Sequence, residues 1–413
     1  MPLATYPVEF LRRIPKTDLH CHLDGSIRIQ TLIDLAKAEG VELPAFTVEG
    51  LEALVFKEQY NSLEEYLEGF HYTEAVLRNE PNLERVAFEM AEDQFNVGIR
   101  YFEVRYAPQL HAIPGQLSVE QVIEAVDRGL KRAVHEFNAK PEVVSGEEPE
   151  YGYGQILCAM RFFTPEFSPW FKSFWEVHQF ETPKRIYGLA AVSLVATCAN
   201  LRSKTDIPIC AFDIAGAEKG FPASDFQEAF KLAHKKFLFK TVHAGEAYGP
   251  ESIFQAIADC HAERIGHGFH LFDTTYFTNA EKSEEDRNNY ISGLIKYMSN
   301  QRICIEVCLS SNLQTMPEAT LLTHPVKKMI EHKIAFSLCS DNMTVSRTHV
   351  LKELELAIGA FDLSPRQVKD ITITGFKRSF MHGEYVHKRA YVRRIINFYE
   401  KLEKEYGIVT PSI

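Results

Sequence analysis

Paired cysteines are absent from this sequence. None of the eight cysteines forms a Cys-X-X-Cys pair, and several lie inside apolar stretches of the 413-residue chain. The spacing therefore argues against a disulfide framework, and we expect reduced, buried thiols in a soluble, cytoplasmic protein. The N-terminal residues contain no long apolar core and reach Arg12 and Arg13 early, so they do not predict a signal peptide.

Long hydrophobic runs are also absent. The most apolar long stretch, residues 187–201, is too short and too interrupted to cross a bilayer, so we expect no membrane as partner. Positive charge is in deficit, since 45 lysines and arginines stand against 56 aspartates and glutamates and give a formal net charge of −11. Binding to a nucleic-acid backbone needs clustered Lys and Arg. The composition therefore argues against a nucleic-acid partner and permits a neutral small-molecule substrate.

Glycine-rich phosphate loops are missing as well, because neither Gly-X-Gly-X-X-Gly nor Gly-X4-Gly-Lys-Ser/Thr occurs. The sequence has instead a regular alternation of short β-rich runs with amphipathic helical patterns, which predicts a parallel α/β sheet. Several runs are almost continuously apolar, as expected of strands covered on both faces. Eight candidate strands favour a closed (β/α)8 TIM barrel over an open sheet. The predicted strands are residues 17–23, 100–107, 154–162, 207–215, 239–245, 263–268, 302–309 and 333–340.

We predict a single domain over residues 1–413, because the sequence contains no internal repeat and no linker long enough to separate two domains. Residues 45–98 predict helices inserted after the first strand, and residues 349–413 predict further helices at the C-terminus. Residues 164–184 contain both tryptophans and predict an insertion after the third strand. We interpret its aromatic side chains as core packing, with a lid or an oligomer contact as the alternatives. The sequence does not define whether the chain forms a homo-oligomer.

The first candidate site residues are His20 and His22, which lie two apart on the first predicted strand. Side chains alternate across a strand, so both point to the same side and could bind one metal ion. Two uncoordinated histidines at a strand end are the alternative for the pair alone. The pair ends a strand at the position where barrel enzymes carry their chemistry, which favours the metal site.

Further histidines and carboxylates follow later strands. His243 and Glu246 end the fifth strand in TVHAGE, His267 ends the sixth in RIGHG, and Asp341 follows the eighth in SLCSDN. Three imidazoles and one carboxylate suit a borderline divalent ion such as zinc, with one position open for water. Structural roles are the alternatives: a satisfied core histidine for His243, a turn for His267, and helix caps for Glu246 and Asp341.

The segments TDLHCHLDGSIR, FDIAG, TVHAGE, RIGHG and SLCSDN occur here in the order and approximate spacing of the adenosine deaminase family. The resemblance runs from about residue 10 to beyond residue 380. It implies a hydrolytic deaminase that converts adenosine, and also 2′-deoxyadenosine, to an inosine-type nucleoside and ammonia. It also implies one Zn2+ per chain, with a purine nucleoside and water as partners. The zinc ligands of the family match His20, His22, His243 and Asp341.

The same resemblance implies roles for other residues. Glu246 matches the acid that protonates ring nitrogen 1 of the purine, a role that needs a raised pKa. His267 matches the group that orients the metal-activated hydroxide and accepts its proton. The backbone amide of Gly216 matches the donor to ring nitrogen 3, and Asp24 matches the residue that meets the ribose 5′-hydroxyl. For Gly216 and Asp24, a strand end and a simple turn are the alternatives.

Asn342 departs from the family pattern, which most often has a second aspartate at this position. An asparagine amide can donate to ring nitrogen 7 without being protonated, so we expect this contact to persist. The choice of substrate stays open, with aminodeoxyfutalosine, free adenine and N6-methyl-AMP as alternatives to adenosine. We find no basic cluster for a phosphate group beside these motifs, apart from the single Arg347. A catalytically silent metal-binding scaffold is a more distant alternative, since Glu246 and His267 are both retained.

Overall fold

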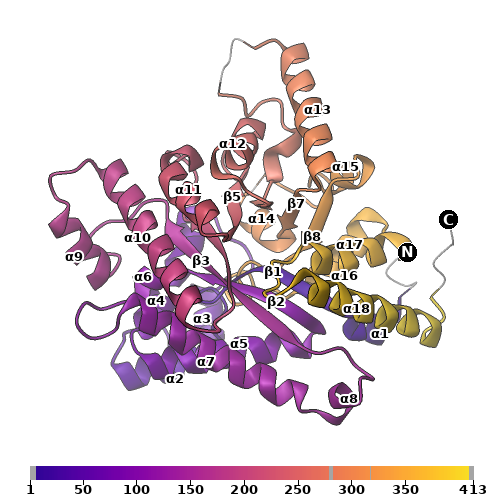
Figure 1. Ribbon diagram of the computed structural model, residues 1–413, viewed down its shortest axis with the longest axis horizontal. Helices are drawn as coiled ribbons and strands as arrows, with labels where there is room; N and C mark the ends of the chain where they lie inside the picture. Colours follow the sequence, from indigo (N-terminus) through magenta and orange to yellow (C-terminus); the bar gives the residue numbers. More distant parts are fainter. Residues whose placement is uncertain (1–5, 279–281, 317, 409–413) are drawn as a thin grey trace.

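The computed structural model describes residues 6–278, 282–316 and 318–408. Eight parallel strands form one sheet in the order β1 to β8 (Figure 1). β8 meets β1 through a parallel bridge between Cys21 and Asp341, so the sheet is nearly closed into the predicted (β/α)8 barrel. The strands are β1 (Lys16–His22), β2 (Ile99–Tyr106), β3 (Gly152–Met160), β4 (Ile209–Ala215), β5 (Phe239–Ala244), β6 (Arg264–His267), β7 (Cys304–Val307) and β8 (Ala335–Leu338).

The strands are hidden from solvent on both faces. Every residue of β2 and of β4 is buried, as parallel strands covered by helices require. Each strand begins and ends within two residues of its predicted range. All eight cysteines are buried and free, as expected from their apolar surroundings.

Helices connect the strands and cover the outside of the barrel. Up to β4 they are α1 (Val8–Arg13), α2 (Ile29–Glu39), α3 (Val48–Leu54), α4 (Leu63–Val76), α5 (Glu80–Asn96), α6 (Pro108–His111), α7 (Val119–Asn138), α8 (Pro141–Val144), α9 (Pro169–Val177) and α10 (Pro183–Lys204). After β4 they are η2 (Ala223–Phe226), α11 (Gln227–Lys235), α12 (Pro250–Cys260), η3 (Phe269–Phe272), α13 (Glu284–Gln301), α14 (Leu309–Thr315), α15 (Val326–Glu331), α16 (Val350–Phe361), α17 (Pro365–Arg378) and α18 (Tyr385–Glu405).

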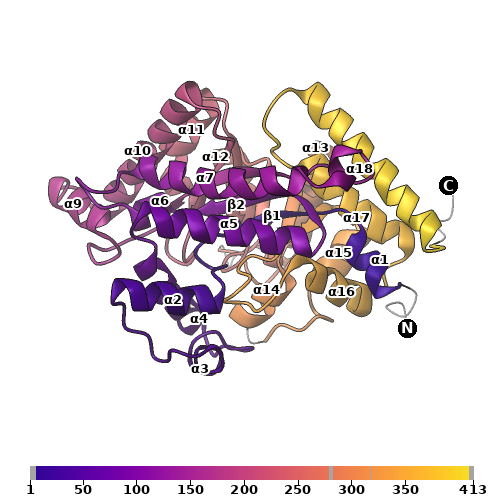
Figure 2. The same cartoon turned by 90° about the horizontal axis from the view of Figure 1, so that it is seen from below.

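The predicted insertion over residues 45–98 contains α3, α4 and α5. Figure 2 shows α2, α3 and α4 grouped on one side of the barrel, while α5 runs beside α7 along its wall. Ser118 caps the N-terminus of α7. Its hydroxyl accepts a hydrogen bond from the backbone N–H of Gln121, and the Gln121 side chain accepts one from the backbone N–H of Ser118. This reciprocal capping fixes where the helix starts.

The tryptophan-containing segment packs through its aromatic rings. Phe163 and Phe171 are fully buried and stack with ring centroids 4.1 Å apart, and the Trp175 ring lies 6.0 Å from that of Phe163. Phe167, between β3 and α9, lines the cavity described below. Most aromatic side chains of the segment therefore pack into a local core around Phe171, as the sequence interpretation expects, whereas Phe180 is exposed.

The expectation for the apolar stretch 187–201 was wrong in one respect. The helix that contains it, α10, has 22 residues, and an 18-residue window of it has a mean hydropathy of 1.2, so by length and composition it could span a membrane. The described residues contain one such helix. In the fold, α10 follows β3 and packs against β3, β4 and the neighbouring α11, with Leu194, Val195 and Cys198 buried. It occupies the place of a barrel helix.

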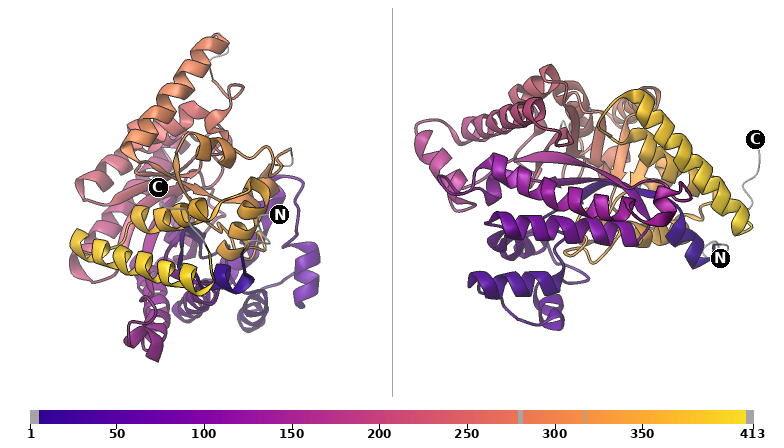
Figure 3. Two further views of the ribbon diagram at one scale, coloured as in Figure 1. Left: turned by 90° about the vertical axis from the view of Figure 1, so that its right-hand side faces the viewer. Right: turned by 60° about the horizontal axis from the view of Figure 1, so that its bottom comes forward.

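The C-terminal region 349–413 contains α16, α17 and α18 in its described part. α17 packs against β8 and β1, and α18 lies along α17 (Figure 3). The Tyr391 hydroxyl of α18 donates to the backbone oxygens of Arg100 and Glu150, each at 2.8 Å. These helices therefore hold together the edge at which β8 and β1 close the barrel.

Candidate active site

The carboxyl ends of β1, β5 and β8 bring together the four predicted metal ligands. One ring nitrogen each of His20, His22 and His243 lies within 4.8 Å of the other two. The Asp341 Oδ1 atom lies 3.3 Å from His20 Nε2 and 3.4 Å from His22 Nε2. The Nε2 atoms of His22 and His243 are 3.4 Å apart. Side chains from three separate strand ends therefore converge on one point.

These residues fit a zinc ion. His20 is fully buried, and its Nε2 atom has no hydrogen-bond partner among the described residues. A buried nitrogen without a partner is costly, so the position calls for a ligand. Three nitrogen donors and one carboxylate match a borderline divalent ion, whereas Mg2+ and Ca2+ prefer oxygen donors throughout. The Sγ atom of Cys308 also lies within 4.8 Å of ligand atoms of His20 and Asp341, so this thiol borders the same site.

A buried carboxylate orients His20. The Nδ1 atom of His20 lies 2.8 Å from Glu306 Oε2. The Glu306 carboxylate also accepts hydrogen bonds from Arg105 at 2.8 Å, from Arg264 at 2.7 Å and from Thr241 at 2.8 Å. Burial alone would raise the pKa of Glu306, but the two guanidinium groups hold that pKa well below its ordinary value. The ionised carboxylate fixes the ring of His20 with Nε2 toward the site.

His243 has an equivalent partner in Asp213 of β4. The Nδ1 atom of His243 lies 2.9 Å from Asp213 Oδ2, and Arg105 donates to the same carboxylate oxygen at 2.8 Å. Burial opposes ionisation of Asp213, yet the charges of His243 and Arg105 lower its pKa below the ordinary value. Sequence reasoning missed Asp213, Glu306 and Arg105. The signal for Asp213 and Glu306 was a single charged residue inside an otherwise apolar strand, whereas Arg105 lies in a strand with two further charged residues.

Glu246 lines the cavity next to this cluster and is partly exposed to it. Desolvation raises the pKa of Glu246, while the nearby His267 and His20 act in the opposite direction. The carboxyl group therefore keeps its proton to a higher pH than an exposed glutamate does.

The loop that carries Glu246 is held by Glu218, a residue that sequence reasoning did not single out. The Glu218 carboxylate accepts from the backbone of Gly245 at 3.1 Å, Glu246 at 3.0 Å, Ala247 at 2.7 Å and Tyr248 at 3.1 Å. It also accepts from the Ser252 hydroxyl at 2.5 Å. One side chain thus satisfies the backbone of the whole turn between β5 and α12.

A chain of hydrogen bonds sets the orientation of His267. The backbone N–H of Val326 donates to His324 Nδ1 at 3.3 Å, so His324 presents its protonated Nε2 to Asn312 Oδ1, also at 3.3 Å. Burial lowers the pKa of His324 to about 3, so this ring is neutral. The Asn312 amide nitrogen then faces His267 Nδ1 at 3.1 Å and donates to it. The protonated nitrogen of a neutral His267 is therefore Nε2.

Two of the site residues have unusual backbone conformations. His267 and Asp341 have φ angles of 63° and 60°, in the left-handed region that residues other than glycine rarely adopt. His267 lies against the metal cluster, with its ring centroid 4.9 Å from that of His20. Such strain is typical of functional sites, where the surrounding fold fixes the conformation.

The cavity above the cluster has a volume of about 530 Å3, within the range of small-molecule sites. Its inner end is lined by the chemical groups just described, and much of its wall is apolar. The lining includes the apolar residues Leu67, Phe70, Leu110, Met160, Phe162 and Phe167. A flat, largely apolar molecule with a few polar edges suits this shape.

The predicted substrate-binding residues also line the cavity. Asp24 is buried, its Oδ1 atom has no hydrogen-bond partner among the described residues, and burial raises its pKa to about 7. Gly216 has a φ angle of 93°, which glycine adopts readily. The Asn342 amide donates to the Tyr66 hydroxyl at 2.7 Å, which leaves its second N–H for another acceptor. A Cβ atom at Gly25 would lie 1.9 Å from Asn342 Oδ1, so the position of Asn342 depends on that glycine.

Arg347, the one basic residue that the sequence places beside the site motifs, lies outside the cavity. Arg347 pairs with Glu52 at 3.2 Å and Glu58 at 3.9 Å and is not among the cavity residues. Arg78, which follows α4, lines the cavity instead. The sequence did not point to Arg78, because no local motif shows which face of the inserted helices turns toward the barrel.

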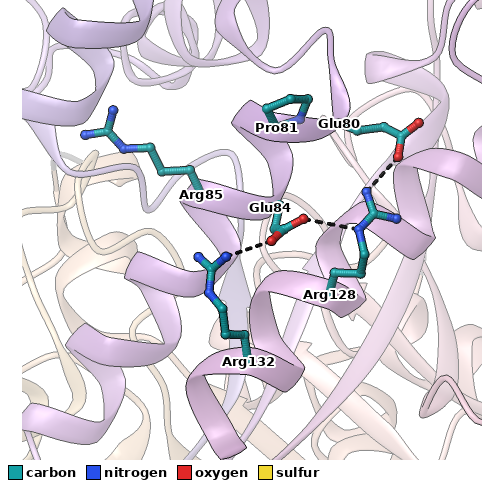
Figure 4. A pocket seen from close by; sticks show the side chains of 6 residues that line it. All are labelled: Glu80, Pro81, Glu84, Arg85, Arg128 and Arg132. Carbon is teal, nitrogen blue, oxygen red and sulfur yellow. Dashed lines mark hydrogen bonds and ion pairs between the residues drawn. The ribbon is translucent and has the colours of Figure 1, made fainter. Parts of the chain in front are cut away.

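A second hollow, between α5 and α7, is lined by charged side chains that pair with one another (Figure 4). Arg128 lies 2.6 Å from Glu80 and 3.1 Å from Glu84, and Arg132 lies 2.7 Å from Glu84. Arg85 pairs with Glu89 at 2.9 Å. These ion pairs connect α5 with α7. The predicted catalytic and substrate-binding residues line the first cavity instead.

Comparison with known proteins agrees with this geometry. The family model described as adenosine deaminase matches residues 15–162 and 184–397. The chain belongs to the adenosine deaminase family. The gap in the match falls on the tryptophan-containing segment. This family consists of hydrolytic deaminases, so the enzyme class predicted from the sequence is confirmed.

Two relatives illustrate the extent of the similarity. Adenosine deaminase of Klebsiella pneumoniae is 34% identical over 388 residues, which cover 92% of this chain and 98% of that protein. A probable adenosine deaminase of Dictyostelium discoideum is 32% identical over 375 residues, 91% of this chain, but the chain spans only 41% of that longer protein.

Solved structures share the fold. An amidohydrolase from Burkholderia ambifaria with bound Zn has a TM-score of 0.73 at 19% identity and covers 97% of this chain and 94% of its own. Adenine deaminase from Arthrobacter aurescens has a TM-score of 0.69 at 20% identity, and Arabidopsis N6-mAMP deaminase has 0.69 at 24%. Each of these two covers 94% of this chain and 99% of its own. At these identities the neighbours establish the barrel and leave the substrate open.

Proposed function

We propose that this protein is a zinc-dependent deaminase that converts adenosine, and also 2′-deoxyadenosine, to the inosine-type nucleoside and ammonia. The observation that carries the proposal is the convergence of His20, His22, His243 and Asp341 at the inner end of a cavity that Glu246 also lines. The names of two relatives at 34% and 35% identity, both adenosine deaminases, point to the same substrate.

The four converging side chains would hold one zinc ion per chain. A zinc ion bound there would supply Lewis acidity, which would lower the pKa of a water molecule at the site to roughly 7. Glu306 and Asp213 keep His20 and His243 turned toward that point. Loss of either carboxylate would release a ligand ring from its orientation.

Glu246 acts on the purine. Its raised pKa keeps the carboxyl group protonated, and the proton passes to ring nitrogen 1 and makes carbon 6 more electrophilic. The backbone amide of Gly216 would donate to ring nitrogen 3, and the free N–H of Asn342 to ring nitrogen 7. Together these contacts present carbon 6 to the attacking water.

His267 orients that water. Because the relay from His324 through Asn312 places the proton on His267 Nε2, this nitrogen donates a hydrogen bond in the resting state. His267 passes this proton to the departing amino group, which leaves as ammonia, and takes a proton from the water in its place, so that one hydrogen of water reaches ammonia through this ring. Of the two hydrogens of water, one leaves with the amino group as ammonia, and the other replaces the proton that Glu246 gave to nitrogen 1.

The experiment is to monitor ultraviolet absorbance of the purified zinc-loaded protein with adenosine, 2′-deoxyadenosine, adenine, AMP, N6-methyl-AMP and aminodeoxyfutalosine. We expect adenosine and 2′-deoxyadenosine to be converted with the highest kcat/KM. Conversion of a different 6-aminopurine in preference to both would replace the substrate in this proposal. No conversion of any of them would contradict the deaminase itself and favour a silent scaffold.

A further inference from the structure

The outer part of the cavity contains an acidic group that the proposed chemistry does not use. Glu74, on α4, lines the cavity together with Asp24 and with Arg78, which follows the same helix. The charges of Asp24 and Arg78 both act on Glu74. The three side chains therefore lie near one another on the cavity wall.

Glu74 has unused hydrogen-bonding capacity. No hydrogen bond or ion pair joins its carboxyl group to any described residue, although the side chain is only partly exposed. Desolvation, with the charge of Asp24 next, raises the pKa of Glu74 to about 8. Arg78 is similarly incomplete, because its Nη1 atom is buried without a partner and its Nη2 atom makes one contact, 3.4 Å from the backbone oxygen of Phe167. Polar groups left unpaired at a cavity wall are suited to a polar ligand.

We propose that Glu74 is a specificity residue that accepts a hydrogen bond from a sugar hydroxyl of the nucleoside, an inference that rests on the proposed function. With Asp24 it forms an acidic subsite that selects unphosphorylated nucleosides over 5′-nucleotides. The purine is largely apolar and suits the apolar wall, so the hydroxyl-rich sugar is the part of the substrate that needs carboxyl partners. A 5′-phosphate would bring negative charge beside two acidic groups, which repel it wherever they are ionised, while Arg78 offers a single positive charge.

The test compares Glu74→Gln and Glu74→Leu with wild type on adenosine, its 2′-, 3′- and 5′-deoxy analogues, and AMP. Glu68→Leu is the matched control, since Glu68 is exposed on the same helix and lies outside the cavity lining. We expect Glu74→Leu to lower kcat/KM for adenosine by about 3- to 10-fold, the usual cost of one lost hydrogen bond. The loss should vanish on the one deoxy analogue that lacks the contacted hydroxyl. Glu74→Gln should raise the use of AMP relative to adenosine above the raised pKa of about 8, where the wild-type carboxyl group is ionised and the amide is not.

A binding measurement separates this inference from the proposed function. Glu74→Leu should weaken binding of inosine by a similar factor and leave binding of hypoxanthine, which has no sugar, unchanged. Equal losses on every analogue, or equal effects on inosine and hypoxanthine, would overturn the role of Glu74. So would a wild-type preference for AMP that Arg78→Ala abolishes, because the outer end would then be a phosphate site. A wild type that converts none of the compounds contradicts the proposed function instead.

Discussion

Glu246 is the side chain that we propose as the proton donor to the purine. Desolvation raises its pKa, so the protonated form, which donates to the purine, is lost only as the pH rises through that raised value. We predict that kcat/KM for adenosine falls on the alkaline limb of its pH profile. Glu246→Gln should retain zinc, lose about 10²- to 10⁴-fold in kcat, and no longer show that limb, since an amide does not titrate there. Near-normal turnover of this variant would refute the assignment.

Asn342 gives a second prediction, on recognition rather than on proton transfer. One of its two N–H groups is bound to Tyr66, and the other is available to ring nitrogen 7. Asn342→Ala should weaken binding of purine nucleosides by about 3- to 10-fold, the usual worth of one hydrogen bond. The 7-deaza analogues lack the acceptor and serve as the control. Equal weakening of both series would show that Asn342 does not contact that nitrogen.

The site residues that could be predicted from the sequence share one property: they stand at the ends of predicted strands. His20, His243 and Asp341 could be placed together because parallel strands in a barrel end on the same rim. Residues that act through a neighbour could not be assigned. Asp213 and Glu306 lie inside strands, and their roles depend on which ring they meet across the barrel.

At the scale of elements, the turn between β5 and α12 depends on a single side chain. Glu218→Ala would leave four backbone N–H groups without their acceptor, and hydrogen bonds to charged groups are worth about 1.5–3 kcal/mol each. We predict a loss of unfolding free energy of about 3 kcal/mol in denaturant titrations, and a lower kcat, because Glu246 lies on this turn. Glu228→Ala is the control, because its exposed pair with Arg185 is worth about 0–1 kcal/mol. Equal stabilities of the two variants would contradict the role of Glu218.

The elements themselves differ in how far the sequence determines them. A strand such as β4 was predictable to within two residues, because burial on both faces leaves a run that is apolar apart from Asp213. The faces of the inserted helices were not predictable. Which side of α4 turns Tyr66 and Glu74 toward the cavity depends on packing against distant parts of the chain, which no local periodicity reports.

For the whole molecule, the metal should act as a stabilising ligand of the folded state. Its ligands come from β1, β5 and the residues after β8, so they are close together only when the barrel is closed. A ligand that binds only the folded state at about 1,000 times its dissociation constant adds about 4.1 kcal/mol. We predict that removal of zinc by a chelator lowers the Tm by several degrees and that added zinc restores it. An unchanged Tm would mean that no ion bridges these strand ends.

The central claim is that one ion, held by four side chains, makes adenosine deamination possible. It is tested most directly by titrating zinc into metal-free protein while bound zinc per chain and ammonia release from adenosine are measured on the same samples. We predict that activity rises in proportion to bound zinc and stops rising at one ion per chain. His243→Ala should bind zinc more weakly and stay inactive at that ratio. Adenosine turnover that does not depend on bound zinc, or saturated protein that leaves adenosine unchanged, would contradict the account.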